Sequence, residues 1–216
     1  MNIVFRILCL VMGYCFGMIQ WAYILGRKNG IDIREHGSGN SGTTNALRVM
    51  GPRTGIAVFL LDMCKSLLAI LLTGLLFGKS HPELVYLLKM YTMAGCVLGH
   101  DFPFYMNFRG GKGVAVMAGF VFAFHISFFP IAVLLFFGPF LLTHFVSLGS
   151  LMLYAGVLIQ VIVEGQMGLF APASQSTLIE LYVIQALLTC MAWYRHRANI
   201  RRLLGGNESK TYLRKH

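Results

Sequence analysis

A glycine-rich polar segment at residues 36–48 reads His-Gly-Ser-Gly-Asn-Ser-Gly-Thr-Thr-Asn-Ala-Leu-Arg. Glycines allow backbone N–H groups to approach an anion closely, and consecutive N–H groups can form a nest for it. An arginine adds a planar fork of donors that suits phosphate. We therefore predict that the segment binds a phosphate group through Ser38, Thr44, Asn45 and Arg48. A flexible loop followed by a helix cap is the alternative interpretation.

A short helix is expected directly after these glycines. It would extend from Thr43 to Met50, and Gly51-Pro52 would end it. Its exposed N-terminal amides would favour an anion. Thr44 and Arg48 are four residues apart, so they would share one face of that helix.

A second glycine-rich segment, residues 107–113, reads Asn-Phe-Arg-Gly-Gly-Lys-Gly. It is not the P-loop of nucleotide-binding proteins, because Lys112 is followed by Gly113 instead of Ser or Thr. Gly110, Gly111, Lys112 and Gly113 nevertheless precede an apolar stretch, where they would cradle a second phosphate. A turn with a lysine that snorkels to the membrane surface is the alternative.

The third polar segment, residues 195–208, is rich in arginine and contains His196, Asn199 and Glu208. A histidine with a pKa of about 6.5 suits proton transfer near neutral pH. We therefore predict His196 as a general base, with Asn199 and Glu208 as orienting partners. In a helix, His196 and Asn199 would share one face, and Gly205-Gly206 would end that helix. A substrate phosphate acting as the base, or a basic stretch that only meets anionic lipid, remains open.

The composition indicates a membrane protein. Of the 216 residues, 56% are hydrophobic and only 12% are charged, whereas a soluble domain has about 25% charged residues. Residues 114–163 contain no Asp, Glu, Lys or Arg, and one transmembrane helix needs only roughly 20 apolar residues. The chain has 18 Lys and Arg against 8 Asp and Glu, and these basic residues lie mostly in loops beside apolar stretches. They indicate an anionic membrane face and an anionic substrate instead of nucleic acid. The N-terminal apolar stretch is too long for a cleavable signal peptide.

The basic residues also predict the topology. They gather around residues 27–53, 109–112 and 195–215, and the positive-inside rule places all three groups in the cytoplasm. An even number of crossings must then separate the last two groups, which assigns three short helices to the uncharged block. We predict an all-α, polytopic membrane protein with seven transmembrane helices, its N-terminus outside and its C-terminus cytoplasmic, in a single domain over residues 1–216. The three polar segments would then form one composite site that binds more than one phosphate.

The predicted helices follow the apolar stretches. Four of them cover Ile3–Leu25, Thr54–Phe77, Pro82–Gly99 and Thr177–Tyr194. Three more divide residues 114–163, where Pro130, Gly138, Pro139 and the Gly149-Ser150 pair offer break points.

One ion pair is expected inside the second stretch, where Asp62 and Lys65 are three residues apart. A charge at mid-membrane costs roughly 2.5–3.5 kcal/mol on insertion scales. The two side chains should therefore pair and face the bundle interior. We interpret the pair as neutralisation of charge within the fold instead of catalysis.

The order and spacing of the three polar segments resemble the signature motifs of the bacterial acyl-phosphate:glycerol-3-phosphate acyltransferases, the PlsY family. The matching residues are Gly-Ser-Gly-Asn-x-Gly-x-Thr-Asn-x-x-Arg at 37–48, Gly-His-x-Phe-Pro with Gly-Gly-Lys-Gly at 99–113, and Arg-His-x-x-Asn-Ile-x-Arg-Leu with a later Gly-x-Glu at 195–208. The resemblance covers essentially the whole chain. Thr43, Arg109 and Val116 depart from the residues common in the family.

This resemblance implies transfer of a fatty acyl group from acyl phosphate to the 1-hydroxyl of sn-glycerol 3-phosphate, which gives lysophosphatidic acid and phosphate in phospholipid synthesis. It implies a multi-pass protein of the bacterial cell (inner) membrane, in contact with membrane lipid, whose active site faces the cytoplasm. No cofactor, metal, acyl-CoA, nucleic acid or obligate protein partner is expected. An organic-phosphate transporter is the second hypothesis, but transporters bind substrate near the membrane midplane between repeats, and no repeat is visible. A lipid-binding scaffold would leave the glycine-rich segments unexplained.

Overall fold

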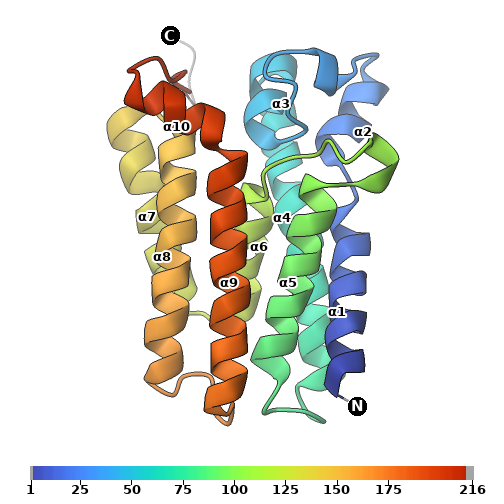
Figure 1. Cartoon of the computed structure of the whole chain (residues 1–216). Coiled ribbons are helices and arrows are strands. Elements are labelled where there is room, and N and C mark those ends of the chain that lie inside the picture. The colour runs from blue at the N-terminus through green and yellow to red at the C-terminus, as the bar shows by residue number, and fades with distance from the viewer. Residues whose placement is uncertain (1, 213–216) are drawn as a thin grey trace. The chain divides into compact units, whose positions relative to one another are not determined.

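The chain folds into helices in the computed structural model, which describes residues 2–212, and no strand occurs among those residues (Figure 1). It divides after Phe124 into two compact units. Unit 1 consists of α1 (Asn2–Gly17), α2 (Trp21–Lys28), the 3₁₀ helix η1 (Ile33–Glu35), α3 (Thr43–Met50), α4 (Pro52–Phe77), α5 (Val85–Asp101), the 3₁₀ helix η2 (Phe104–Met106) and α6 (Val114–Phe124). Unit 2 consists of α7 (Phe128–Thr143), α8 (Val146–Gln166), α9 (Gln175–Arg195) and α10 (Arg197–Leu204). Arg214 and Lys215 of the third basic group lie outside the described residues.

Several helices have the length and the apolar surface that suit a lipid environment. Stretches long and apolar enough to cross a membrane are Ile3–Lys28, Pro52–Phe77, Val146–Gln166 and Gln175–Arg195, and α6 and α7 are shorter apolar helices. Large apolar side chains cover their outer surfaces: Leu75 is 81% exposed and Leu142 is 86% exposed. Water would disfavour such a surface, whereas lipid tails match it. The predicted all-α fold is confirmed.

The first apolar stretch, predicted as one helix over Ile3–Leu25, is divided into α1 and α2 by a short break. A break leaves backbone carbonyls without partners in the helix, and here distant side chains bind them. The Lys65 ammonium donates to Ile19 O at 2.6 Å, and the Tyr105 hydroxyl donates to Met18 O at 2.7 Å. Irregular backbone is tolerated at membrane depth where such partners exist. The prediction was wrong because the partners come from other parts of the chain and leave no signal in the stretch itself.

Glycines bring α1 and α5 into backbone contact. Gly13 and Gly17 lie against the α5 backbone, and Gly95 and Gly99 lie against the α1 backbone. A methyl group at any of the four would overlap main-chain atoms. Both pairs have the Gly-x-x-x-Gly spacing that favours close helix packing in membranes. The contact places the C-terminal end of α5, and the loop that follows it, beside the α1–α2 break.

The helix α6 has only 11 residues. At 1.5 Å per residue it is about 16 Å long, which is shorter than the hydrocarbon core of a bilayer. Its last carbonyls, Ala123 O and Phe124 O, accept hydrogen bonds from the Lys89 ammonium of α5 at 3.1 and 3.3 Å. The cation also suits the negative end of the helix dipole. Lys89 therefore binds the carbonyl oxygens that α6 leaves open, which allows this helix to end before it has crossed the hydrocarbon core.

The uncharged block forms three helices, as predicted, but the breaks lie at residues 125–127 and 144–145 instead of at the candidate break points. Pro130 stands in the first turn of α7, where its missing N–H removes no helical hydrogen bond. Gly138–Pro139 lies inside α7, and Gly149–Ser150 lies inside α8. Proline and glycine were therefore accommodated within helices instead of ending them.

The chain turns instead where polar side chains bind one another. Before α7, Ser127 Oγ donates to Glu164 Oε2 at 2.6 Å, and His125 Nδ1 lies 2.7 Å from Ser127 Oγ. Gln160 Nε2 donates to Glu164 Oε1 at 2.6 Å. Before α8, His144 takes a left-handed conformation with φ 61°. The bond between Ser127 and Glu164 joins residues 37 positions apart in the chain, so the apolar pattern did not reveal this turn.

Candidate functional site

The first glycine-rich segment is organised by Asn45, which is buried in the first turn of α3. Its Oδ1 accepts a hydrogen bond from Ser38 N at 2.9 Å. Its Nδ2 donates to Ile33 O and His36 O at 3.2 and 3.0 Å. Both amide hydrogens are thus used inside the loop. The structure places Asn45, which we predicted as a substrate ligand, where it positions Ser38.

This loop presents several of the predicted phosphate ligands at its surface. Gly37 has φ 61°, a left-handed conformation that glycine adopts readily. A Cβ at Gly37 would overlap Asn45 Oδ1. Ser38 and Arg48 are exposed, and Thr44 is half-buried one turn before Arg48. A hydroxyl and a guanidinium are therefore accessible on this loop and helix.

A carboxylate–guanidinium pair fixes the chain that leads into the loop. Arg34 Nε and Nη2 donate to the two carboxylate oxygens of Asp32 at 2.9 and 2.7 Å. The guanidinium also lies over the ring of Tyr23, with Cζ 4.9 Å from the ring centroid. The hydrogen bond from Arg34 lowers the pKa of Asp32 to about 2, so this carboxylate stays charged at neutral pH.

The second glycine-rich segment caps α5. Gly110 N and Gly111 N donate to the carbonyl oxygens of the last two residues of that helix, at 3.1 and 2.9 Å. These two amides, which we predicted for a phosphate, thus bind carbonyls that the helix leaves open. Gly110 and Gly111 shape the loop, while the half-buried Lys112 and the buried Gly113 stand directly before α6.

A hydrogen bond joins the two glycine-rich segments. Asn40 Nδ2 donates to Gly110 O at 3.2 Å. The segment around α3 and the loop after α5 lie at the same end of unit 1, away from the N-terminus of α1 (Figure 1). The structure therefore brings the first two predicted segments together.

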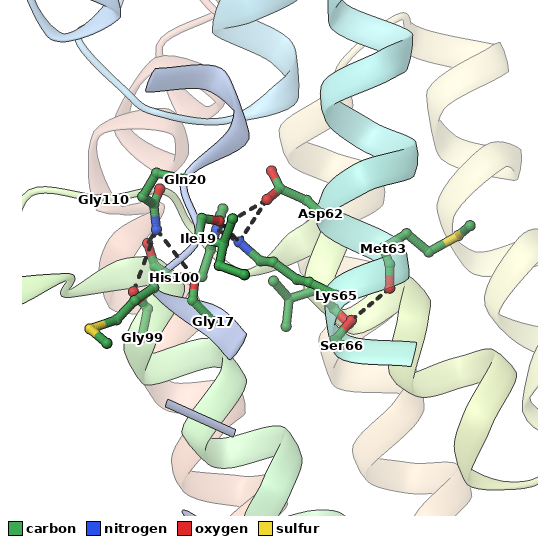
Figure 2. Close-up of polar contacts among 12 residues, drawn as sticks. Gly17, Ile19, Gln20, Asp62, Met63, Lys65, Ser66, Gly99, His100 and Gly110 are labelled. Atoms are coloured by element: carbon green, nitrogen blue, oxygen red, sulfur yellow. Dashed lines mark hydrogen bonds and ion pairs between the residues drawn. The ribbon is translucent and has the colours of Figure 1, made fainter. Parts of the chain in front are cut away.

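A buried polar cluster stands beside this contact, formed by Gln20, Asp62, Lys65 and His100 (Figure 2). The Lys65 ammonium is 2.7 Å from Asp62 Oδ1 and 3.0 Å from His100 Nδ1. Gln20 Nε2 donates to His100 O at 2.9 Å. The predicted Asp62–Lys65 pair is confirmed, and it also ties α4 to the end of α5. We did not predict His100 as a site residue, although its place next to Gly99 was an available signal.

The third segment is organised by Glu208, within unit 2. Its Oε1 accepts from Asn199 Nδ2 at 2.6 Å and from Ser147 Oγ at 2.9 Å. Its Oε2 accepts from Arg202 Nε at 2.7 Å. Glu208 therefore fastens α10 to the start of α8. Ser147 was not predicted, because it stands 61 residues away in a different stretch of the chain.

These contacts also determine the charge of Glu208. Burial by itself would raise its pKa, but hydrogen bonds from Asn199, Arg202 and Ser147, with the charge of Arg202, outweigh burial and lower the pKa. The carboxylate is therefore ionised at neutral pH.

The imidazole of His196 is buried between α9 and α10. The helix expected to run through this segment is interrupted here, and α10 begins at Arg197 and ends before Gly205. His196 Nδ1 lies 2.8 Å from Ala192 O. A carbonyl oxygen only accepts, so Nδ1 carries the hydrogen and, in the neutral ring, Nε2 carries the lone pair. This is the tautomer that a general base acting through Nε2 requires.

The predicted site residues thus fall into two groups. The first and second segments meet in unit 1, and the third is ordered within unit 2. One composite site made from all three stays a prediction. Among residues 2–212, no three His, Cys, Asp or Glu side chains gather as metal ligands.

Comparison with known proteins gives one consistent result. A family model described as glycerol-3-phosphate acyltransferase matches residues 7–206. Relatives named glycerol-3-phosphate acyltransferase include one from Bacillus cytotoxicus, 36% identical over 96% of both chains, and one from Clostridioides difficile, 36% identical over 97% of both chains. Two crystal structures of PlsY, described as an integral membrane glycerol 3-phosphate acyltransferase, are similar with TM-scores of 0.81 and 0.79. Both are 30% identical over 96% of each chain. One is the glycerol 3-phosphate form and the other is the lysophosphatidic acid form.

Proposed function

The chain belongs to the glycerol-3-phosphate acyltransferase family, and on this premise we propose that it acylates the 1-hydroxyl of sn-glycerol 3-phosphate to form lysophosphatidic acid. It is an integral membrane protein with a helical fold. The observation that carries the proposal is its similarity, over 96% of the chain, to structures in a substrate form and a product form. All three polar segments lie within or at the edge of the matched residues 7–206.

The acyl donor in this proposal is acyl phosphate, as the resemblance of the three segments implies. Acyl phosphate is a mixed anhydride with a good leaving group, so the enzyme mainly has to align a hydroxyl with a carbonyl. The hydroxyl oxygen attacks the acyl carbon, and the bond from that carbon to the phosphate oxygen breaks. Inorganic phosphate leaves, and cationic groups offset its charge.

The hydroxyl proton passes in this account to His196 Nε2. The hydrogen bond from Nδ1 to Ala192 O supports this role, because it leaves the lone pair on Nε2. Asn199 and Glu208 hold the adjoining helix. The pH–rate profile tests the role: His196→Gln should lose the acidic-limb pKa together with most of kcat. An unchanged profile with only a raised KM would assign proton transfer to a substrate phosphate.

Phosphate binding falls to Arg48 and Lys112, supported by Ser38, Thr44 and Gly113. Gly110, Gly111 and Asn45 shape the loops that carry these groups. A charge-assisted contact contributes about 1.5–3 kcal/mol, so Arg48→Ala and Lys112→Ala should each reduce kcat/KM roughly ten- to hundredfold while the protein still inserts. Normal kinetics in either variant would remove that residue from the site.

For the membrane arrangement we propose seven spans in one domain over residues 1–216, in the bacterial inner membrane, with the N-terminus outside and the site facing the cytoplasm. The division of basic residues supports this orientation. Single cysteines at Ser38, Asn107 and Asn207 should all be labelled from the cytoplasmic side. Opposite accessibility of any one would contradict the composite site.

The decisive experiment uses purified protein with acyl phosphate and glycerol 3-phosphate. Lysophosphatidic acid and phosphate should appear in equal amounts, whereas acyl-CoA should give no product. Uptake of glycerol 3-phosphate into proteoliposomes without acylation would instead support the transporter.

A further inference from the structure

We propose that Asp62, Lys65 and His100 form a positioning relay that directs the His100 Nε2 hydrogen at the Gly110–Gly113 loop and thereby sets the affinity for glycerol 3-phosphate. The inference rests on the proposed function for its substrate. It assigns a task to a buried ion pair that the sequence presented only as charge neutralisation.

The relay begins with the hydrogens of Lys65. An ammonium group has three hydrogens and no acceptor. Three groups lie within reach of Nζ: Ile19 O at 2.6 Å, Asp62 Oδ1 at 2.7 Å and His100 Nδ1 at 3.0 Å. Figure 2 shows Lys65 extending from α4 toward this group. Because the ammonium only donates, His100 Nδ1 must accept.

The tautomer of His100 follows from this contact. A nitrogen that accepts carries a lone pair, so the hydrogen of the neutral ring is on Nε2. A doubly protonated ring would set an N–H of His100 against the Lys65 ammonium. His100 is 2% exposed, so water does not relieve such a clash. Lys65 therefore determines which ring nitrogen is the donor.

The donor nitrogen is directed at the glycine-rich loop. A Cβ built on Gly111 would overlap His100 Nε2 and would lie 2.7 and 2.8 Å from Cδ2 and Cε1 of the same ring. Gly111 is therefore required at this position by the ring itself. The next residue along the loop is Lys112, the proposed phosphate ligand.

The backbone of His100 holds the same loop. His100 O accepts from Gly111 N and from Gln20 Nε2, each at 2.9 Å. Gln20 follows directly on Ile19, whose carbonyl binds Lys65. The α1–α2 break thus supplies two contacts to the relay. A pair that only neutralised charge would need neither the break nor the histidine.

Lys65 and His100 act in this arrangement as positioning residues, because their contacts go to the loop. Their loss should raise the KM for glycerol 3-phosphate more than it lowers kcat. Lys65→Met alone would leave Asp62 buried and unpaired, which destabilises strongly. The test therefore uses the double variant Asp62→Asn/Lys65→Met, in which no buried charge remains.

The double variant should raise the KM for glycerol 3-phosphate by roughly tenfold or more, with kcat within about threefold of wild type. Lys89→Met is the matched control, because Lys89 is a half-buried lysine of unit 1 whose ammonium also donates to backbone carbonyls, in its case those of α6. It should lower stability and leave this KM unchanged. Equal KM values in the double variant and in Lys89→Met would overturn the proposal.

A second pair of variants leaves both charges in place. The amide nitrogen of Gln reaches the position of the histidine Nε2, whereas that of Asn does not. His100→Gln should therefore keep the KM within about threefold of wild type, while His100→Asn should raise it roughly tenfold. The same KM in both variants would contradict a directed Nε2–H donor.

A spectroscopic measurement shows which ring nitrogen of His100 carries the hydrogen, and it needs no enzyme turnover. In ¹⁵N-histidine-labelled protein at neutral pH, the His100 signal, assigned by its loss in His100→Gln, should show hydrogen on Nε2 and none on Nδ1. The double variant should lose this preference. A wild-type ring with hydrogen on Nδ1 would refute the relay. If wild type forms no lysophosphatidic acid, the proposed function fails, while this signal still decides the relay.

Discussion

Glu208→Gln is the change whose effect follows most directly from the structure. Glutamine keeps Oε1 as an acceptor for Asn199 and Ser147 but sets an NH₂ group against Arg202 Nε. The Arg202 side chain is 44% exposed, so this ion pair contributes only about 0.5–1 kcal/mol. Loss of charge weakens the short bond from Asn199 by about 1 kcal/mol, because bonds to charged groups contribute about 1.5–3 kcal/mol and neutral ones about 0.5–1.5 kcal/mol.

The expected loss of stability is therefore roughly 1.5–2 kcal/mol, which lowers Tm by about 3–8 °C in a chain of this size. Thermal unfolding in detergent, followed by intrinsic fluorescence, measures it. The same variant should lose part of kcat, because Asn199 and the helix that follows His196 are then less firmly held.

The dependence on pH provides an independent check. The folded state lowers the pKa of Glu208, through hydrogen bonds from Asn199, Arg202 and Ser147 that outweigh burial. Its contribution is then fully present above the unfolded pKa of about 4.3 and is lost as pH falls through the folded pKa. The Tm difference between wild type and Glu208→Gln should be constant from about pH 6 to 8 and should shrink below about pH 4.

Glu35→Gln is the matched control, because Glu35 is exposed and undergoes the same chemical change. Its effect should be within about 0.5 kcal/mol of wild type. Equal Tm changes in both variants, or a difference for Glu208→Gln that persists in acid, would refute the assignment of Glu208 as the clamp of α10.

Three further predictions follow from the packing and the loops. Gly95→Leu should prevent close packing of α1 on α5 and lower the free energy of unfolding by about 3 kcal/mol or more. Gly138→Leu should be neutral, because no atom lies within 4 Å of its Cβ position. Thermal unfolding of both variants measures the difference. Asn45→Ala should reduce kcat/KM at least about tenfold, because Ser38 N and two loop carbonyls lose their partner. Asn207→Ala, at an exposed position, should not, and the acyl phosphate assay distinguishes them. Lys89→Met should lower the free energy of unfolding by about 1–3 kcal/mol through the open carbonyls of α6, and denaturant unfolding in detergent measures it.

The residues that support the proposed phosphate-binding loops link stability to catalysis. The loops that carry Arg48 and Lys112 are supported from within unit 1 by Asn45 and by the buried cluster around Lys65. A site that mainly aligns two phosphates gains from such rigid support, because misplacement of a substrate by about 1 Å costs rate. Stability and activity should therefore change together in variants of the supporting residues, while variants of the exposed ligands should change activity alone.

The sequence by itself determined the features that depend on local composition. Apolar length marked the helical stretches, and the division of basic residues among three groups predicted three helices in the uncharged residues 114–163. The bounds of α3, Thr43–Met50, followed from the glycines before it and from Gly51-Pro52 after it. The glycine-rich and arginine-rich segments identified the family. Each of these signals lies within a few neighbouring residues, where propensity and hydropathy act.

Only the tertiary structure decided how the polar groups are paired. The break between α1 and α2 depends on Lys65, which is 46 residues from the carbonyl it binds. The amides of Gly110 and Gly111 cap α5. Glu208, which follows α10, accepts a hydrogen bond from Ser147 of α8. In a lipid environment each buried donor or acceptor must find a partner within the protein. Which donor meets which acceptor depends on proximity in the folded chain. Spacing along the sequence therefore indicated candidate site residues but not the contacts that hold them.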